Sequence, residues 1–346
     1  MANKLFSSKE NFRQTFEQGL VDLLDQDGIG TFILVLANSS FDKHVHDYTE
    51  SCILQRYEEL SSYYQYALKE GIILSEPEDD VLVFLKLLAI SLAKIRATEF
   101  RREGNWELQF NHMRSLRPAR VSNHDFTGTE IPFDEQAFNF NKPFLQKEAY
   151  WNGEFLGKHL SIFYNKFPFA RFHSLLVPDK NLQINQLLNY TYHEYIWQFA
   201  EKFAESLPGL GLAYNSIGAF SSVNHLHFHF FIKDNPLPIM YKRWSHNGGK
   251  IDYPLNCHVF TRIQESWEFI DCLNKKHIPY NLFYLPGKIF CVPRRHQCDV
   301  ASPDWSSGFA WYEISGGFTT FNHDDFSGLD GDTLFSELKK LKMDCE

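Results

Sequence analysis

The sequence predicts an α+β fold, in which a helical N-terminal region precedes short strands arranged around one long helix. Two patterns support this prediction. In the first hundred or so residues, apolar side chains recur three and four positions apart over long stretches. After them, short apolar runs alternate with turn residues. We therefore divide the chain into a helical region, 1–105, and a second domain, 106–346.

Three helices are expected in the first region, at 6–26, 43–70 and 77–100, with Ser7 or Ser8 as N-cap of the first. In the second domain we expect strands at 159–165, 172–179, 211–220 and 225–232, and a helix at 181–207. Further along we expect a strand at 257–263, a helix at 265–276 and a hairpin at 280–295.

The composition limits the partners of the protein. The chain has 346 residues, a formal charge of −9 and 33 Phe, which is typical of a globular protein with an aromatic interior. The negative net charge argues against a nucleic acid polymer as partner, because binding to nucleic acid needs a basic surface. The longest apolar stretch, 81–93, is too short to span a membrane and is interrupted by Lys86. We expect no membrane partner.

The cysteines indicate a reducing compartment. There are six, and none forms a CxxC pair. Cys291 and Cys298 are the nearest two, and their spacing does not suit a zinc knuckle. The N-terminal residues contain no apolar signal core. These features predict reduced cysteines and a cytoplasmic protein.

The motif NHLHFHFFI, residues 224–232, places His225, His227 and His229 on alternate positions. On a strand the three imidazoles would share one face, and the apolar residues between them would face a core. Such a row predicts a site for a phosphate or a metal, or a purely structural role. The flanking Asn, Ser and Gly residues suit phosphate oxygens better than a metal. A neutral imidazole can attack phosphorus and leave again.

Other polar residues accompany the row. His173 begins an expected strand, and Asn165 lies eight residues before it. The turn that leads into the row contains Asn215, Gly218, Ser221 and Ser222. Farther along the chain, we expect Arg294, Arg295 and His296 to lie on a solvated surface.

These motifs resemble the histidine-triad superfamily, whose signature alternates three histidines with apolar residues on a strand. The segment YNSIGAFSSVNHLHFH is most similar to the GDP-hexose phosphorylases. This branch of the superfamily belongs with galactose-1-phosphate uridylyltransferase. AFNFNKP (137–143), HIPYNLFYLPGKIFCVPRR (277–295) and FAWYEISGGF (309–318) are also similar to this branch. YNKFPFARFHSLLVPD looks closer to the dinucleoside tetraphosphate phosphorylases. The resemblance covers roughly residues 106–330.

The resemblance implies a role for each site residue. His227 would be the nucleophile that becomes nucleotidylated on one ring nitrogen, while a backbone carbonyl holds the other. His229 would contact the transferred phosphate and the bridging oxygen, and His225 and His173 would support them. Asn165 takes the place of a ribose-binding residue. The donors to the α-phosphate would be Asn215, Ser221 and Ser222. Glu313, Gly316 and Gly317 match the branch, and we assign them no role.

The resemblance also implies the reaction class. A nucleoside diphosphate sugar, such as a GDP-hexose, would transfer its nucleotidyl group to His227 and then to inorganic phosphate. A dinucleoside polyphosphate is the alternative substrate, hydrolysis the alternative reaction, and a nucleotide-binding sensor the alternative of a different class. The uridylyltransferases generally have Gln where this chain has His229, so the acceptor stays open. We expect no required cofactor and no metal, and a homodimer is an open alternative.

The fold that the resemblance implies is a histidine-triad-like antiparallel sheet with helices, centred on residues 155–240. The hairpin at 280–295 looks like an echo of residues 160–180. A degenerate second half of a duplicated fold, at 250–330, would produce that echo.

Overall fold

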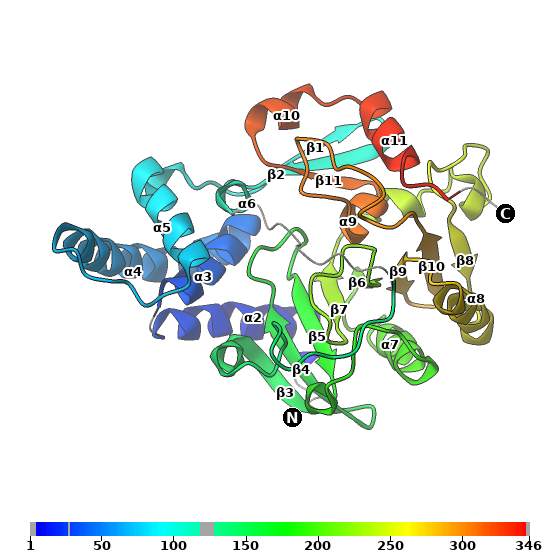
Figure 1. Ribbon diagram of the computed structural model, residues 1–346, viewed down its shortest axis with the longest axis horizontal. Coiled ribbons are helices and arrows are strands. Elements are labelled where there is room, and N and C mark those ends of the chain that lie inside the picture. The colour runs from blue at the N-terminus through cyan, green and yellow to red at the C-terminus, as the bar shows by residue number, and fades with distance from the viewer. Residues whose placement is uncertain (1–4, 27, 118–127, 344–346) are drawn as a thin grey trace.

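The computed structural model describes residues 5–26, 28–117 and 128–343. Two sheets and the helices around them make up this part of the chain, so the predicted α+β class is confirmed (Figure 1). The N-terminal helices are α2 (Lys9–Leu24), α3 (Ile29–Phe41), α4 (Lys43–Lys69), α5 (Glu78–Ile90) and α6 (His112–Leu116). The later helices are α7 (Tyr190–Lys202), α8 (Ile263–Lys275), α9 (Trp311–Ile314), α10 (His323–Gly328) and α11 (Gly331–Lys339).

The strands form one large and one small sheet. The large sheet contains β3 (Ala149–Phe155), β4 (Lys158–Tyr164), β5 (Ser174–Pro178), β6 (Leu210–Asn215), β7 (Phe228–Ile232), β8 (His258–Phe260), β9 (Tyr280–Leu285) and β10 (Lys288–Pro293). The small sheet contains β1 (Glu99–Glu103), β2 (Trp106–Phe110) and β11 (Gly317–Thr320). Because β11 pairs with β2, the C-terminal part of the chain returns to the N-terminal part.

The first two predicted helices are confirmed and the third is shorter than expected. α2 begins after Ser8, whose side-chain oxygen accepts a hydrogen bond from the Asn11 N–H. The third helix, α5, ends at Ile90, and the chain then forms β1 instead of continuing as helix to residue 100. The β1–β2 hairpin turns at Gly104, which has a φ of 57°. Pairing with β2 therefore replaces the last turns of the predicted helix.

Helix α2 packs on the large sheet and shares its core. The ring centroid of Phe12 lies 4.9 Å from that of Phe230 in β7, and Phe16 lies 4.9 Å from Tyr164 in β4. The Tyr164 hydroxyl also donates to the Phe16 carbonyl over 2.7 Å. The same hydrophobic cluster extends from the N-terminal helices to β10. The change of sequence pattern near residue 105 thus lies in the turn of the β1–β2 hairpin, within one continuous structure.

The large sheet has the strand order β3-β4-β5-β7-β6-β9-β10-β8, and all its pairings are antiparallel. The two halves of this sheet contain the same succession of strands and helix along the chain. On one side β5, α7, β6 and β7 follow each other along the chain, and on the other side β8, α8, β9 and β10 do so. In both, the first strand pairs with the last, and β6 pairs with β9 in the middle. A duplicated unit would produce this arrangement, and the duplication stays a hypothesis. By topology, β9 and β10 correspond to β6 and β7, not to the β4–β5 hairpin that the sequence comparison suggested.

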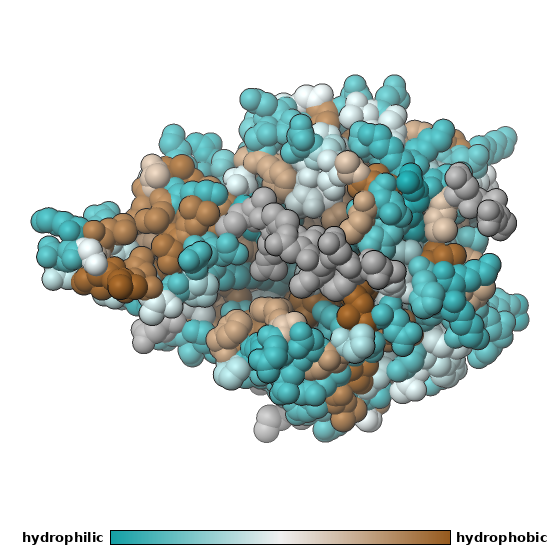
Figure 2. Space-filling model, viewed as in Figure 1, coloured by the Kyte–Doolittle hydropathy of each residue, from teal (hydrophilic) through white to brown (hydrophobic). Residues whose placement is uncertain are grey.

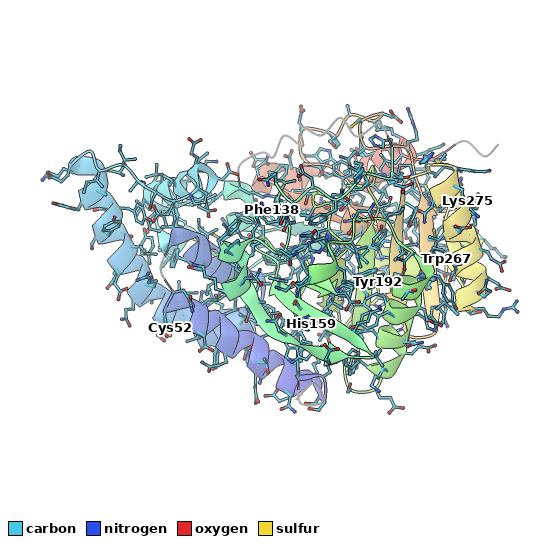
Figure 3. The ribbon with its side chains drawn as sticks, turned by 60° about the horizontal axis from the view of Figure 1, so that its bottom comes forward. Cys52, Phe138, His159, Tyr192, Trp267 and Lys275 are labelled. Atoms are coloured by element: carbon cyan, nitrogen blue, oxygen red, sulfur yellow. The ribbon has the colours of Figure 1, made fainter. Side chains whose placement is uncertain are left out.

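The two faces of the large sheet are covered differently. Helices α2, α7 and α8 cover one face, where Leu226, Phe228 and Phe230 enter the main core. Figure 3 shows Tyr192 on α7 and Trp267 on α8, the two helices that contact each other on this side. The opposite face carries the histidines and is covered by α9, by the small sheet and by the segment before β3 (Figure 1).

Exposed apolar side chains gather at the end of the molecule formed by α4 and α5 (Figure 2). They include Tyr63, Tyr66, Leu68, Ile73 and Leu82. Among the described residues, no helix combines the length and apolar character that crossing a membrane requires.

Candidate functional site

The central histidine, His227, has one ring nitrogen fixed and the other free of protein partners among the described residues. Its Nδ1 lies 2.8 Å from the His225 carbonyl oxygen, which can only accept, so Nδ1 carries the proton and Nε2 carries the lone pair. Burial lowers the pKa of His227 to about 4, which keeps the ring neutral near pH 7. The nitrogen that can attack an electrophile is therefore Nε2.

A buried glutamine that the sequence prediction missed holds this segment in place. The Gln186 Oε1 accepts from the His227 backbone N–H over 2.9 Å. Its Nε2 donates to the carbonyls of His227 and Asn215 over 3.2 and 3.0 Å. Gln186 lies in the segment expected to be helix from residue 181, but α7 begins only after Asn189, whose side chain caps it. The residues before the cap bond to the histidine segment instead, as in the Leu226 N–H to Ile184 carbonyl bond of 2.8 Å.

We expect Gln186→Leu to destabilise the fold and the site together. The change leaves the backbone N–H of His227 and the carbonyls that Gln186 binds without their side-chain partner, and a buried polar group without a partner costs about 1–3 kcal/mol. Urea unfolding should show a loss of this order or larger. Gln198→Leu, at an exposed position of α7, is the matched control and should change stability by less than about 0.5 kcal/mol. Equal stability of the two variants would contradict the proposed role of Gln186.

The strand that carries the histidines starts later than predicted. β7 begins at Phe228, so His229 lies in the strand while His225 and His227 lie in the segment before it. The alternation nevertheless holds, because the residues between the histidines are buried in the main core. The reason for the late start is that the segment ahead of β7 pairs with the loop at Ile184 and not with a strand.

His229 and His173 form a directly bonded pair. The His229 Nδ1 lies 2.9 Å from the His173 Nε2, and burial lowers the pKa of both rings well below 6.5. The Trp311 backbone N–H donates to the Asn215 Oδ1, so the Asn215 Nδ2 faces the His229 Nε2 at 3.3 Å as a donor. At the other end, the Phe169 N–H donates to the His173 Nδ1 over 3.3 Å.

The two outer nitrogens of this pair are the His229 Nε2, which faces Asn215, and the His173 Nδ1, which faces the Phe169 N–H. Both cannot accept hydrogen bonds while both rings are neutral. If both outer nitrogens accepted, each ring would direct its single N–H at the other across the 2.9 Å contact. One outer contact must therefore give way. When the His229 Nε2 carries the proton, the ring can donate that proton to an oxygen of a bound phosphate, while its Nδ1 accepts from His173.

His225 lies at the other end of the row. Its Nδ1 accepts from the Phe140 backbone N–H over 3.2 Å, and its Nε2 is buried without a partner among the described residues. Burial first, and the neighbouring His227 second, lower the pKa of His225 to about 4. Phe140 also lies 5.3 Å from the His227 ring, so the segment before β3 forms an aromatic wall over this end.

The remaining predicted residues lie around this row. Asn165 is partly buried, and its Nδ2 lies 3.4 Å from the His173 Nε2. Asn215 is buried, and its side chain contacts protein groups on both sides. The Ser221 hydroxyl is buried and donates to the Val223 carbonyl, whereas Ser222 is exposed. As placed, the Asn215 Nδ2 faces the His229 Nε2, and Ser222 is the serine that is open to a ligand. Which of these residues bind the nucleotide stays a prediction.

The turn before the serines depends on a glycine. Gly218 has a φ of 81°, and a Cβ there would collide with the His296 ring. This close approach brings the loop after β6 against the loop after β10.

Three charged side chains form a buried cluster that the sequence did not reveal. Arg294, expected on a solvated surface, is fully buried, and one of its terminal nitrogens has no partner among the described residues. Burial raises the pKa of Glu313 to about 7 and lowers that of Arg294 to about 9. Arg114 is also buried, with its guanidinium over the Phe169 ring. The Glu313 carboxylate accepts from the Ala310 N–H and so holds α9 beside His229.

Within residues 5–26, 28–117 and 128–343, no group of three or more His, Cys, Asp or Glu side chains is arranged to hold a metal ion. The histidines instead bond to a backbone carbonyl, to an amide and to each other.

Several known proteins are similar to this chain in sequence. Residues 103–231 match a family model described as "GDPGP1-like, N-terminal domain". GDP-D-glucose phosphorylase 1 of Danio rerio is 25% identical over 221 residues, which cover 60% of this chain and 62% of the relative. GDP-L-galactose phosphorylase 2 of Arabidopsis thaliana is 26% identical over 164 residues, 40% of this chain and 38% of the relative. The human GDP-D-glucose phosphorylase 1 is 34% identical over 115 residues, 31% of this chain and 29% of the relative.

A solved structure is also similar over much of the chain. The crystal structure of yeast Ap4A phosphorylase Apa2 aligns with 79% of this chain and 98% of its own, at 14% identity and a TM-score of 0.49. The chain spans less than two thirds of the length of each curated relative named above. The expected resemblance is confirmed: residues 103–231 are similar to the N-terminal domain of the GDPGP1-like family, and parts of the chain are similar in sequence to GDP-D-glucose and GDP-L-galactose phosphorylases.

Proposed function

We propose that the protein transfers a nucleotidyl group through a covalent intermediate on His227, and that it phosphorolyses a nucleoside diphosphate sugar, most simply a GDP-hexose. One observation carries this proposal. The His225 carbonyl holds the His227 Nδ1–H at 2.8 Å, which leaves a neutral Nε2 with a free lone pair on the histidine face. The names of the curated relatives support a GDP-hexose as the substrate.

The reaction would take two displacements at one phosphorus atom. In the first, the His227 Nε2 forms a bond to the α-phosphorus and the bond to the bridging oxygen breaks, which releases sugar 1-phosphate. The imidazolium that forms keeps its Nδ1–H on the His225 carbonyl, which stabilises the positive charge. The His229 Nε2–H would donate to the bridging oxygen. In the second step, an oxygen of inorganic phosphate attacks the same phosphorus, the P–N bond breaks, and a nucleoside diphosphate leaves.

The test is a chromatographic analysis of products. GDP-, UDP- and ADP-hexoses and dinucleoside tetraphosphates are each incubated with the protein, with and without inorganic phosphate. We expect a nucleoside diphosphate to appear from a GDP-hexose only when phosphate is present. A monophosphate that appears without phosphate would indicate a hydrolase, a product from the tetraphosphates alone would indicate the other substrate class, and binding without turnover would favour a sensor.

The pH dependence of the first step is a second test. Because burial holds the pKa of His227 at about 4, the ring stays neutral as the pH falls from 8 to about 6, and protonation removes the lone pair only near pH 4. We expect the rate of nucleotidylation, measured by rapid quench, to be flat over the first interval and to fall as the pH approaches 4. A midpoint near 6.5, the ordinary histidine value, would contradict the buried, neutral nucleophile.

We also propose that the enzyme works in a reducing compartment such as the cytoplasm. The five cysteines in the described part of the chain are all unpaired, which supports this location.

A further inference from the structure

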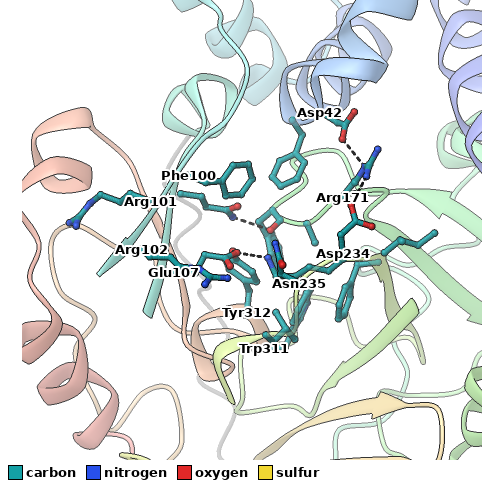
Figure 4. A pocket seen from close by; sticks show the side chains of 18 residues that line it. Asp42, Phe100, Arg101, Arg102, Glu107, Arg171, Asp234, Asn235, Trp311 and Tyr312 are labelled. Atoms are coloured by element: carbon teal, nitrogen blue, oxygen red, sulfur yellow. Dashed lines mark hydrogen bonds and ion pairs between the residues drawn. The ribbon is translucent and has the colours of Figure 1, made fainter. Parts of the chain in front are cut away.

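A cavity of about 440 Å³ lies beyond the end of the histidine row (Figure 4). Three parts of the chain enclose it: the α3–α4 junction at Asp42, the β1–β2 hairpin with Phe100 and Glu107, and the ends of β5 and β7 with Arg171 and Asp234. Its volume is in the range of small-molecule sites. The nucleophile His227 is not among the residues that line it.

The cavity nevertheless adjoins the proposed reaction centre. Phe231 lines it and follows His229 on the same face of β7, at a spacing of about 6.6 Å for two residues of strand. Phe169 and Trp311 line the cavity as well, and their rings lie 6.3 and 5.9 Å from the His229 ring. His227, His229 and the cavity thus follow one another along β7 and the segment that leads into it.

Two buried polar groups at the cavity have no partner among the described residues. They are the Gln109 Oε1 and the Trp311 Nε1, and both side chains are fully buried. The Gln109 amide nitrogen, in contrast, donates to the Phe169 carbonyl and to the Thr319 hydroxyl. Buried groups of this kind are rare in proteins, because each loses its hydrogen bond to water. Neither atom is exposed to the cavity as placed, so a ligand hydroxyl, which can both donate and accept, would satisfy them only after side chains of the cavity wall shift.

The charges around the cavity favour a neutral ligand over a free anion. The Arg171 guanidinium contacts Asp42 and Asp234 at 2.7 and 3.1 Å, and the Lys233 Nζ lies 2.5 Å from the Glu107 carboxylate. Arg101, which also lines the cavity, pairs with Glu103 at 2.8 Å, so three of the four cationic side chains there are matched inside the protein, and the fourth, Arg102, lies exposed. Carboxylates suit sugar hydroxyls as acceptors, and the rings of Phe100 and Tyr312 offer apolar faces to the C–H side of a pyranose.

We propose that this cavity holds the hexosyl group of the substrate, an inference that rests on the proposed function. With the α-phosphorus at the His227 Nε2 and the bridging oxygen at His229, the sugar would lie one phosphate farther along β7, where the cavity begins. The Gln109 Oε1 and the Trp311 Nε1 would bind its hydroxyls. The cavity would then decide which hexose is accepted, while the nucleotide is bound elsewhere on the histidine face.

The test compares two substrates that deliver the same nucleotidyl group to His227. One is the nucleoside diphosphate hexose that wild type accepts, and the other is the matching nucleoside 5′-phosphorimidazolide, which has no sugar. Trp311→Phe removes the unpaired N–H and keeps an aromatic ring. Asn235→Ala removes an amide at the exposed rim of the cavity, where it would hydrogen-bond a hydroxyl of the sugar. Trp267→Phe on α8 and Asn152→Ala on β3 are the matched controls away from the cavity.

We expect both cavity variants to lower kcat/KM for the nucleotide sugar about three- to tenfold, the value of one lost neutral hydrogen bond, and to leave the imidazolide rate within about twofold of wild type. The controls should leave both rates unchanged. Equal losses with the two substrates, or no loss with the sugar substrate, would overturn the cavity assignment while the proposed function stands. If wild type reacts with the imidazolide and with no nucleotide sugar, the proposed function itself fails.

Discussion

Replacing His227 with alanine is expected to lower the phosphorolysis rate by a factor on the order of 10⁴ to 10⁶, as the loss of a covalent nucleophile does in other enzymes. The expectation follows from geometry. His227 is the residue whose Nδ1–H is held by a backbone carbonyl while its Nε2 has no protein partner in the described structure. His229 cannot substitute for it, because its Nδ1 contacts His173 and its Nε2 carries the proton that it donates to the substrate. Product release from the preferred nucleotide sugar, followed by chromatography, measures the effect.

The control for this variant is His258→Ala, at an exposed histidine of β8 on the far edge of the large sheet. It should retain wild-type turnover. The unfolding curve of each variant shows whether the fold is intact, since His227 is buried and its removal also leaves a cavity. An alanine variant that folds and turns over substrate at the rate of the control would mean that His227 is not the nucleophile.

Replacing Phe12 with alanine should cost about 3–5 kcal/mol of stability, the usual loss for a buried phenylalanine. Phe12 is fully buried, with its ring 4.9 Å from Phe230 in the strand that carries His229 and 5.8 Å from Phe172. If the N-terminal helices and the large sheet form one core, urea should unfold wild type and variant in a single transition, and the midpoint of the variant should be lower.

Tyr66→Ala on α4 is the control, because that side chain is 59% exposed and its loss should change stability by less than about 0.5 kcal/mol. Two separate transitions, with the sheet still folded after the first, would show that the N-terminal region is an independent unit. That result would support a domain boundary near residue 105 and contradict the single core.

Local patterns in the sequence predicted the elements that depend on neighbouring residues. The alternating histidines, the β9–β10 hairpin and helices α2 and α4 all have a period or a capping residue within a few positions, and the structure contains each of them. The bond from the His227 Nδ1 to a carbonyl of its own segment was expected from the family resemblance and is present.

Interactions between distant segments were not predictable in this way. Gln186 lies 41 positions from His227, and no spacing rule connects a glutamine in a loop to a backbone N–H that far along the chain. The helix predicted over 181–207 included Gln186 as an ordinary helical residue, whereas the actual helix begins only after its N-cap, Asn189. Arg294 was also misplaced because its contacts are distant in the sequence. Two arginines and a histidine after a strand resemble a solvated end, yet Arg294 turns inward to Phe220 and the Phe309 carbonyl.

The most direct test of the covalent mechanism is the mass of the protein after it meets its substrate without inorganic phosphate. Wild-type protein is mixed with the preferred nucleotide sugar, quenched at alkaline pH, digested and analysed by mass spectrometry. We predict one nucleoside monophosphate attached to the peptide that contains His227, and its loss as nucleoside diphosphate when phosphate is added before the quench. An adduct on another residue, or rapid turnover with no adduct at all, would contradict the account.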